Sequence, residues 1–194
     1  MKRVKLPGGE SVPALGIGTW KIGVGDRDEA AQLKALEAGI AAGMTLIDTA
    51  EMYGEGRSEQ LVAKAIAGKR DKVFVVSKVL PSNASRTGTL KACEASLKRL
   101  GTDVIDLYLL HWRGSYPLRD TVAAFEQLKR EGKIRYWALS NFRGWRIAEV
   151  VHAARQLNMP QPVVCQPYYN LLNRMPEVEI LPACEHHGLG VVPY

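Results

Sequence analysis

Short apolar runs and longer amphipathic segments alternate along the whole chain. Each run rich in valine, isoleucine and leucine is followed by a segment whose apolar residues recur at three- and four-residue intervals. The first pattern is typical of strands buried on both faces, and the second of helices that pack one face against a sheet. The sequence therefore predicts an α/β protein with a parallel sheet covered by helices.

The predicted elements begin with a small β-hairpin over residues 3–15, where Pro7-Gly8-Gly9 favours a turn. Parallel strands are predicted at 16–20, 46–47, 73–78, 105–110, 136–139, 163–165 and 189–192. Helices are predicted at 26–42, 58–67, 85–100, 117–131, 145–157 and 177–186, with Asp26 as the N-cap of the first. Glycines suited to a left-handed position beyond a helix end follow four of them, at Gly43, Gly68, Gly101 and Gly132.

Six of the predicted strands end in a side chain that can donate or accept a hydrogen bond. These residues are Asp48, Lys78, His111, Asn141, Gln166 and Tyr194, at intervals of 30, 33, 30, 25 and 28 residues. Each interval is about one strand–helix unit, so we expect the six side chains to meet at the carboxyl end of the sheet. Tyr53 follows Asp48 by five residues, in a loop with Gly54 and Gly56, and is expected to join them.

Two architectures compete for this pattern. A doubly wound sheet usually carries a glycine-rich phosphate turn after its first strand, and residues 21–30 lack the G-x-G-x-x-G spacing. A TIM barrel instead gathers its active site from the ends of many strands. We therefore predict one domain over residues 1–194, a TIM (β/α)8-type barrel with an N-terminal hairpin. Seven such strands are predicted instead of eight, so the barrel is expected to be truncated after the seventh, with exposed edges through which copies could self-associate.

Composition and charge narrow the function classes. The net charge is +6, but lysines and arginines are scattered among acidic residues, so no nucleic-acid partner is expected. Three cysteines without C-x-x-C spacing fit a reducing compartment. The start lacks a signal peptide's apolar region and no run is long enough to cross a membrane, so a cytoplasmic location is predicted. The adjacent side chains of Cys184–His187 converge poorly on a short helix, so no metal is expected.

Six segments resemble those of the aldo-keto reductase family. They are GIGTW at 16–20, LIDTAEMYG at 46–54, VVSKV at 75–79, DLYLLHW at 106–112, GKIRYWALSNF at 132–142 and QPYYN at 166–170. The resemblance implies an oxidoreductase that reduces aldehydes or ketones to alcohols with NADPH, with NADH as the second choice. It also implies that the family's contacts to the adenosine phosphates, which lie after the seventh strand, are absent from these 194 residues.

The resemblance assigns a role to each matching position. The catalytic tetrad falls on Asp48, Tyr53, Lys78 and His111. Cofactor contacts fall on Thr19, Trp20, Asp48, Ser140, Asn141, Gln166 and Tyr194; the polar Ser140, Asn141 and Gln166 hold the carboxamide of the nicotinamide, and Tyr194 stacks on its ring. Contacts to a small carbonyl substrate fall on Trp20, Tyr53, His111 and Trp112.

The chemistry of these side chains agrees with those roles. Carbonyl reduction needs a proton donor at the oxygen that gains charge, and Tyr53 can be that general acid. Because an unperturbed tyrosine has a pKa near 10, we expect the Lys78 ammonium to lower the pKa of Tyr53. Asp48 is expected to keep Lys78 charged and aimed, and a neutral His111 to orient the substrate oxygen.

Two other functions remain open at this point. A lysine at the end of a barrel strand can form a Schiff base, so Lys78 could serve a lyase or an aldolase, although a neighbouring Asp48 disfavours a neutral amine. The chain could also be an inactive or regulatory barrel with weak cofactor binding.

Overall fold

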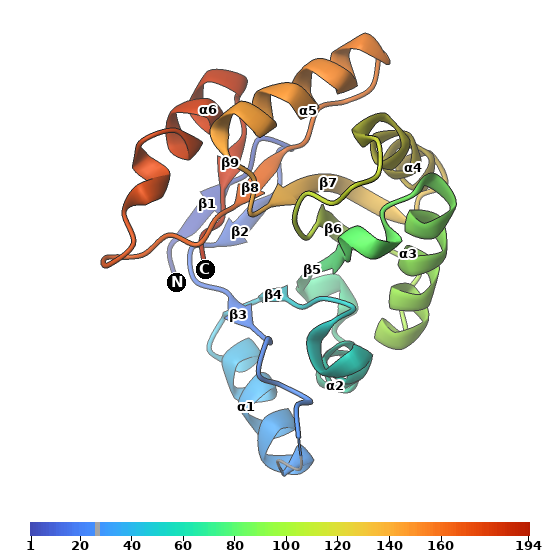
Figure 1. The fold of residues 1–194 in the computed structure, drawn as a ribbon. Helices are drawn as coiled ribbons and strands as arrows, with labels where there is room; N and C mark the ends of the chain where they lie inside the picture. The colour runs from blue at the N-terminus through green and yellow to red at the C-terminus, as the bar shows by residue number, and fades with distance from the viewer. Residues whose placement is uncertain (26–27) are drawn as a thin grey trace.

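The computed structural model describes residues 1–25 and 28–194, and its seven parallel strands curl into part of a barrel with helices on the outside (Figure 1). The strands pair in chain order, β3-β4-β5-β6-β7-β8-β9, so β3 and β9 form the two edges of the sheet. A separate antiparallel hairpin precedes them, with β1 (Arg3–Lys5) paired to β2 (Ser11–Pro13). The predicted barrel type, strand count and hairpin are confirmed. The single-domain assignment and self-association through the edges stay predictions.

The observed elements lie within three residues of the predicted ones wherever they are described. The strands are β3 (Ile17–Gly18), β4 (Leu46–Asp48), β5 (Phe74–Val79), β6 (Ile105–Leu110), β7 (Ile134–Ser140), β8 (Val164–Gln166) and β9 (Gly190–Val191). The α-helices are α1 (Glu29–Ala41), α2 (Arg57–Ala65), α3 (Arg86–Leu100), α4 (Leu118–Arg130), α5 (Gly144–Gln156) and α6 (Ile180–His187). Short 3-10 helices are η1 (Tyr53–Gly56), η2 (Arg70–Lys72), η3 (Pro81–Asn83) and η4 (Met175–Glu177).

Local signals explain where the helices begin and end. The observed N-cap of α1 is Asp28, whose carboxylate accepts from the amides of Ala30 and Ala31, whereas the predicted cap, Asp26, lies outside the described residues. A carboxylate near the first amides of a helix satisfies donors that have no partner within the helix. The four glycines predicted to follow helices all have positive φ, at 91° (Gly43), 69° (Gly68), 61° (Gly101) and 72° (Gly132).

Alternate residues along each strand face the inside of the barrel. One cluster of buried side chains fills this interior, and the successive strands β4 to β8 each contribute to it, through Leu46, Val76, Leu109, Ala138 and Val164. Leu6 and Val12 of the hairpin belong to the same cluster, so the hairpin packs against the inward-facing residues. Side chains two residues apart on a strand share a face. The residues that follow these apolar positions by two, at the carboxyl ends of the strands, therefore also face the barrel axis.

The larger core lies between the strands and the helices. Phe125 of α4 stacks on Trp137 of β7, with ring centroids 5.3 Å apart, and meets Tyr108 of β6 edge to face at 5.8 Å. Leu128, one turn further along α4, is completely buried in this cluster. These contacts fix α4 against the middle of the sheet.

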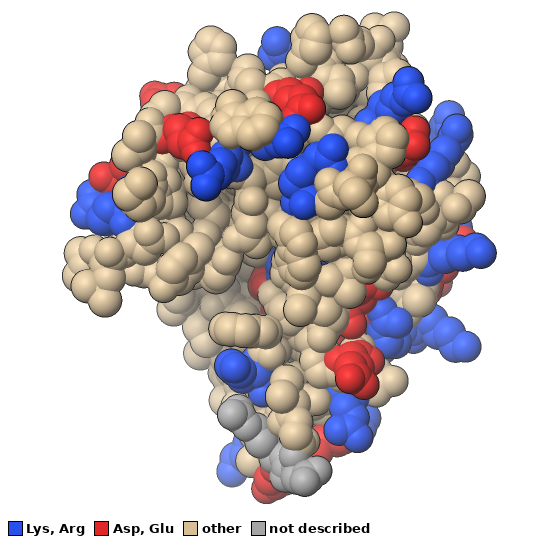
Figure 2. Space-filling view, in the orientation of Figure 1, with Lys and Arg blue, Asp and Glu red and all other residues tan. Residues whose placement is uncertain are grey.

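Charged side chains of both signs intermingle over the face seen in Figure 2. Within the described part of the chain, no helix combines the length and the apolar character needed to cross a bilayer. The expected absence of a nucleic-acid partner and the cytoplasmic location stay predictions.

We expect Leu128→Ala to lower the free energy of unfolding by about 2–5 kcal/mol, because it leaves a cavity in a close-packed core. The matched control is Leu172→Ala, since Leu172 is 94% exposed and its loss should change stability by less than about 0.5 kcal/mol. Denaturant unfolding of both variants measures the two values. Equal effects would mean that α4 does not pack as described.

Candidate active site

The ends of the central strands bring the predicted polar side chains to one mouth of the barrel. Asp48, Lys78, His111, Ser140 and Gln166 each stand two residues beyond an apolar residue of the barrel interior. Each side chain therefore faces the barrel axis, as the apolar residue two positions before it does. Four of them lie within their strands, and His111 directly follows β6. The alternation of the strands, together with parallel pairing in chain order, explains why residues far apart in sequence converge here.

Lys78 is buried beneath this mouth, with 1% of its side chain exposed, and is held by three acceptors. Its Nζ donates to Asp48 Oδ1 at 2.6 Å, to the carbonyl oxygen of Thr49 at 2.9 Å and to Tyr53 Oη at 3.2 Å. An ammonium has three N–H donors, so all three are used. Burial of a charge is costly unless it is paired and hydrogen-bonded, and both conditions are met.

Tyr53 stands at the start of η1 and meets Lys78 through its phenol oxygen. Because Lys78 donates that hydrogen bond, the phenol proton is free to be donated elsewhere. Burial raises the pKa of Tyr53 above its ordinary value of 10, and the nearby Lys78 charge opposes this increase without overcoming it. Lys78 does lower the pKa of Tyr53, as expected, but burial raises it by more. The expected net decrease in the pKa of Tyr53 is therefore wrong. Tyr53 is thus a neutral phenol at neutral pH.

His111 lies directly after β6, between Tyr53 and Trp112. Its ring meets that of Tyr53 edge to face, with centroids 5.8 Å apart, and packs against Trp112 at 4.7 Å. Burial, with a smaller contribution from the Lys78 charge, lowers the pKa of His111 to about 3. The imidazole is therefore neutral at physiological pH. Its Nδ1 is buried and has no hydrogen-bond partner within the described residues.

The four residues predicted to hold a nicotinamide line the opposite side of the mouth. Tyr194 Oη donates to Asn141 Oδ1 at 2.7 Å, and Asn141 Nδ2 lies 3.1 Å from both Ser140 Oγ and the carbonyl oxygen of His111. Gln166 Nε2 donates to Asp48 Oδ2 at 2.8 Å. Because Asp48 also accepts from Lys78 through Oδ1, it joins the predicted cofactor residues to the predicted catalytic ones.

One cavity of about 550 Å³ contains ten of the eleven predicted site residues in its lining. They are Thr19, Trp20, Asp48, Tyr53, His111, Trp112, Ser140, Asn141, Gln166 and Tyr194. Lys78 is the exception and lies below the cavity floor. Trp20 and Trp112 are 62% and 38% exposed, as expected for walls of an open pocket. The hydroxyl of Thr19 bonds within the protein, to the Asp48 carbonyl oxygen at 2.9 Å.

Sequence reasoning missed several residues that belong to this site. Met52 and Lys21 also line the cavity, and the Lys21 ammonium lies 4.3 Å from the centre of a Trp20 ring. In the sequence, Met52 directly precedes Tyr53 and Lys21 directly follows Trp20, and this adjacency could have pointed to both residues. The backbone carbonyl of Thr49 accepts a hydrogen bond from Lys78. Any residue type has this carbonyl, so the contact could not be predicted from the sequence.

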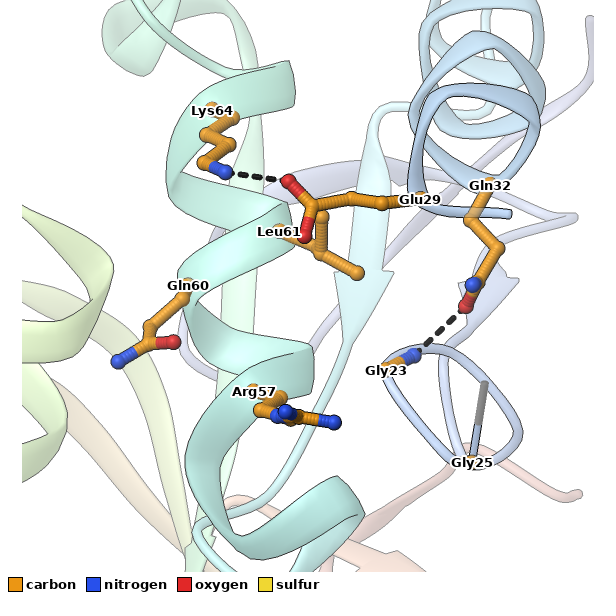
Figure 3. Close-up of a pocket in the computed structure, with 8 residues that line it drawn as sticks. All are labelled: Gly23, Gly25, Glu29, Gln32, Arg57, Gln60, Leu61 and Lys64. Atoms are coloured by element: carbon orange, nitrogen blue, oxygen red, sulfur yellow. Dashed lines mark hydrogen bonds and ion pairs between the residues drawn. The ribbon is translucent and has the colours of Figure 1, made fainter. Parts of the chain in front are cut away.

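A second cavity, of about 460 Å³, lies on the outer surface between α1 and α2 (Figure 3). Its charged side chains include Glu29 and Lys64, which form an ion pair, and Arg57, which extends from the first turn of α2. None of the predicted site residues lines it. Among residues 1–25 and 28–194, no three histidine, cysteine, aspartate or glutamate side chains are grouped so as to hold a metal ion.

The fold and site define a class of protein, a parallel α/β barrel with a Tyr–Lys–Asp–His cluster in its mouth. The sequence profile of the Aldo/keto reductase family matches residues 14–194. The methylglyoxal reductase YeaE of Escherichia coli (strain K12) is 44% identical over 193 residues, covering 100% of this chain and 67% of the relative. The chain belongs to the aldo/keto reductase family.

Solved structures of this family agree with the fold. An aldo/keto reductase from Klebsiella pneumoniae, determined with NADP and acetate, is 43% identical with a TM-score of 0.89, covering 100% of this chain and 67% of that one. The thermostable aldo-keto reductase Tm1743, determined with the inhibitor epalrestat, is 39% identical with a TM-score of 0.93, covering 100% and 72%. The chain spans 67%, 57% and 64% of the lengths of three curated relatives.

The low pKa of His111 predicts a pH dependence of stability. The unfolded chain has the ordinary histidine pKa of 6.5, so between pH 6.5 and about 3 it binds more protons at this position than the folded protein does. The free energy of unfolding should therefore fall as the pH is lowered through this window. In His111→Gln the fall should be smaller, whereas the exposed His152→Gln should keep the wild-type slope. Denaturant midpoints at several pH values test this, and equal slopes in all three proteins would contradict it.

Proposed function

We propose that the cavity reduces aldehydes or ketones to alcohols with NADPH, and that Tyr53 is the general acid. The observation that carries this proposal is the connected series Tyr53–Lys78–Asp48, with contacts of 3.2 Å and 2.6 Å at the base of an open pocket. Titratable groups with perturbed pKa values that converge in a cleft are characteristic of active sites.

The polar groups of the pocket fit a nicotinamide ring. A carboxamide needs both donors and acceptors, which Ser140, Asn141 and Gln166 supply from one side, and Tyr194 adds an aromatic surface beside them. The related Klebsiella pneumoniae enzyme was determined with NADP. Bound in this place, the dihydronicotinamide would supply the hydride, and the protein would supply placement and electrostatics. NADH remains the alternative nucleotide.

The protein residues have distinct tasks in this reaction. Tyr53 is a neutral phenol whose proton has no acceptor among residues 1–25 and 28–194, and it donates that proton to the carbonyl oxygen as negative charge develops there. Lys78 stabilises the resulting phenolate through the hydrogen bond that it already makes to Tyr53 Oη. Asp48 holds Lys78 in place. His111, being neutral, can donate one N–H to the same oxygen and orient the substrate.

The substrate class follows from the walls and from a relative. Trp20, Met52 and Trp112 form apolar walls around a polar floor, which suits a small carbonyl compound. The relative YeaE is named a methylglyoxal reductase, and methylglyoxal is a small α-dicarbonyl. We infer that small aldehydes and α-dicarbonyls are the substrates.

The geometry of Lys78 disfavours the Schiff-base alternative. A nucleophilic amine must be deprotonated and must reach the substrate, whereas Lys78 is buried with its three donors directed at acceptors. Reduction with borohydride that trapped a substrate on Lys78 would revive that alternative.

The first test is a titration of the folded protein with NADPH and with NADH, followed by tryptophan fluorescence. Because Trp20 and Trp112 line the cavity, nucleotide binding should quench their emission. Trp20→Phe should lose part of the quenching, while Trp145→Phe, an exposed residue outside this cavity, should keep it. A folded sample that binds neither nucleotide would support the non-catalytic alternative.

Tyr53→Phe should lower turnover of methylglyoxal by at least about 10²-fold, because it removes the proton donor. Its affinity for NADPH should stay at the wild-type level, since the phenol hydroxyl is assigned to the substrate oxygen. The control is Tyr136→Phe, which removes a phenol that donates to the carbonyl oxygen of Gly8 at 2.8 Å, away from the cavity. Full activity of Tyr53→Phe would remove Tyr53 from the mechanism.

A further inference from the structure

Three completely buried hydroxyl groups join the ends of the loop that carries Tyr53. Thr49 Oγ1 and Ser58 Oγ are 3.1 Å apart, so residues at the start and end of this loop are in direct contact. Ser58 Oγ also lies 2.7 Å from Thr19 Oγ1 and 3.1 Å from the carbonyl oxygen of Thr19. All three side chains are 0% exposed, although none is apolar.

The hydrogen bonds among these hydroxyls have one consistent direction. Thr19 Oγ1 donates to the carbonyl oxygen of Asp48, so it accepts from Ser58, and Ser58 accepts from Thr49. The series runs from Thr49 through Ser58 and Thr19 back to Asp48, the neighbour of Thr49 in the chain. It therefore pins the first turn of α2 to the carboxyl ends of β3 and β4.

The loop closed by this contact has an unfavourable backbone. Gly54, Glu55 and Gly56 are consecutive and have φ of 55°, 55° and 89°. A non-glycine residue such as Glu55 rarely adopts the left-handed region, and such conformations persist only where the surroundings impose them. A Cβ on Gly54 would lie 2.4 Å from the carbonyl oxygen of Gly23, so the loop also packs closely on the segment after Trp20.

The segment around Gly23, which the Tyr53 loop packs against, is also held by α1. Gly23 N donates to Gln32 Oε1 of α1 at 2.7 Å (Figure 3). A Cβ on Gly23 would lie 2.9 Å from backbone atoms of Arg57 and Ser58, so Gly23 packs closely on the start of α2. The Tyr53 loop thus has the Gly23 segment on one side and the hydroxyl series at its base.

We propose that the Thr49–Ser58 contact is a clamp that positions Tyr53, and that Ser58 is a positioning residue of the site. The clamp closes the loop over residues 50–57 and holds Tyr53 Oη within reach of Lys78 Nζ. It also orients the carbonyl of Thr49, which accepts one of the three hydrogen bonds of that ammonium. Its effect on turnover rests on the proposed reductase function, but its effect on the Tyr53 phenol does not.

The experiment compares Thr49→Val and Ser58→Ala with two controls. Thr49→Val keeps the shape of the side chain and removes the hydroxyl, and Thr49→Ser restores the hydroxyl as the conservative rescue. Thr121→Val is the matched control, because Thr121 is also buried, at 2% exposure, and its hydroxyl donates to the Ala84 carbonyl oxygen at 2.6 Å, outside the loop. The readouts are kcat and KM for NADPH and methylglyoxal, and the titration of the Tyr53 phenol by absorbance, with Tyr53→Phe as the blank.

We expect Thr49→Val and Ser58→Ala to lower kcat by about tenfold or more, since small displacements of a catalytic group are costly, with KM for NADPH unchanged. The pKa of Tyr53 should fall toward 10, because a released loop loses both the burial and the smaller opposing influence of Lys78. Thr49→Ser and Thr121→Val should behave as wild type in both readouts.

The experiment distinguishes failure of the proposed clamp from failure of the proposed reductase function. If Thr49→Val and Ser58→Ala lose stability as Thr121→Val does, but keep kcat and the Tyr53 titration, the hydroxyls are structural only and the clamp is wrong. If the wild-type protein binds no nucleotide, the proposed function fails, while the phenol titration still decides whether the clamp exists.

Discussion

The structure depends on one buried cation. Lys78 sits inside the barrel with almost no exposure, and removing an ammonium from water costs several kcal/mol unless other groups replace the water. The replacements come from a carboxylate, a backbone carbonyl and a phenol, contributed by β4, the residue after it and η1. The buried charge is stable only where these elements are in register, so the packing of this end of the barrel and the geometry of the site depend on each other.

The same constraint explains why the site has two linked halves. Asp48 uses one carboxylate oxygen for Lys78 and the other for Gln166, which lies on the far side of the mouth. Any group that competes for the amide of Gln166 changes the hydrogen bonding of Asp48 and, through it, that of Lys78. The residues proposed to hold the cofactor and those proposed to handle the proton therefore share the Asp48 carboxylate, so a change in one group alters the hydrogen bonding of the other.

Much of this could be read from the sequence because the signals are local or periodic. The spacing of polar residues at strand ends predicted which side chains meet, and the four glycines after helices predicted left-handed backbone at those points. The sign of the Tyr53 pKa shift could not be predicted, because burial and the Lys78 charge oppose each other and burial has no sequence signal. The proposed Thr49–Ser58 clamp could not be predicted either, because the sequence pattern indicates only that Ser58 begins a helix.

The clamp and the buried Lys78 both fix the positions of the site residues, the clamp in a loop and Lys78 between strands. Parallel strands position Asp48 and Lys78 through the rigid sheet, but Tyr53 lies in a loop, where precision is lost unless the loop is closed at its base. A hydroxyl series supplies that closure without adding a charge near Lys78, which a carboxylate or ammonium at position 58 would do. Neutral donors and acceptors thus fix the geometry, and the electrostatics of the phenol are left to Lys78, Asp48 and burial.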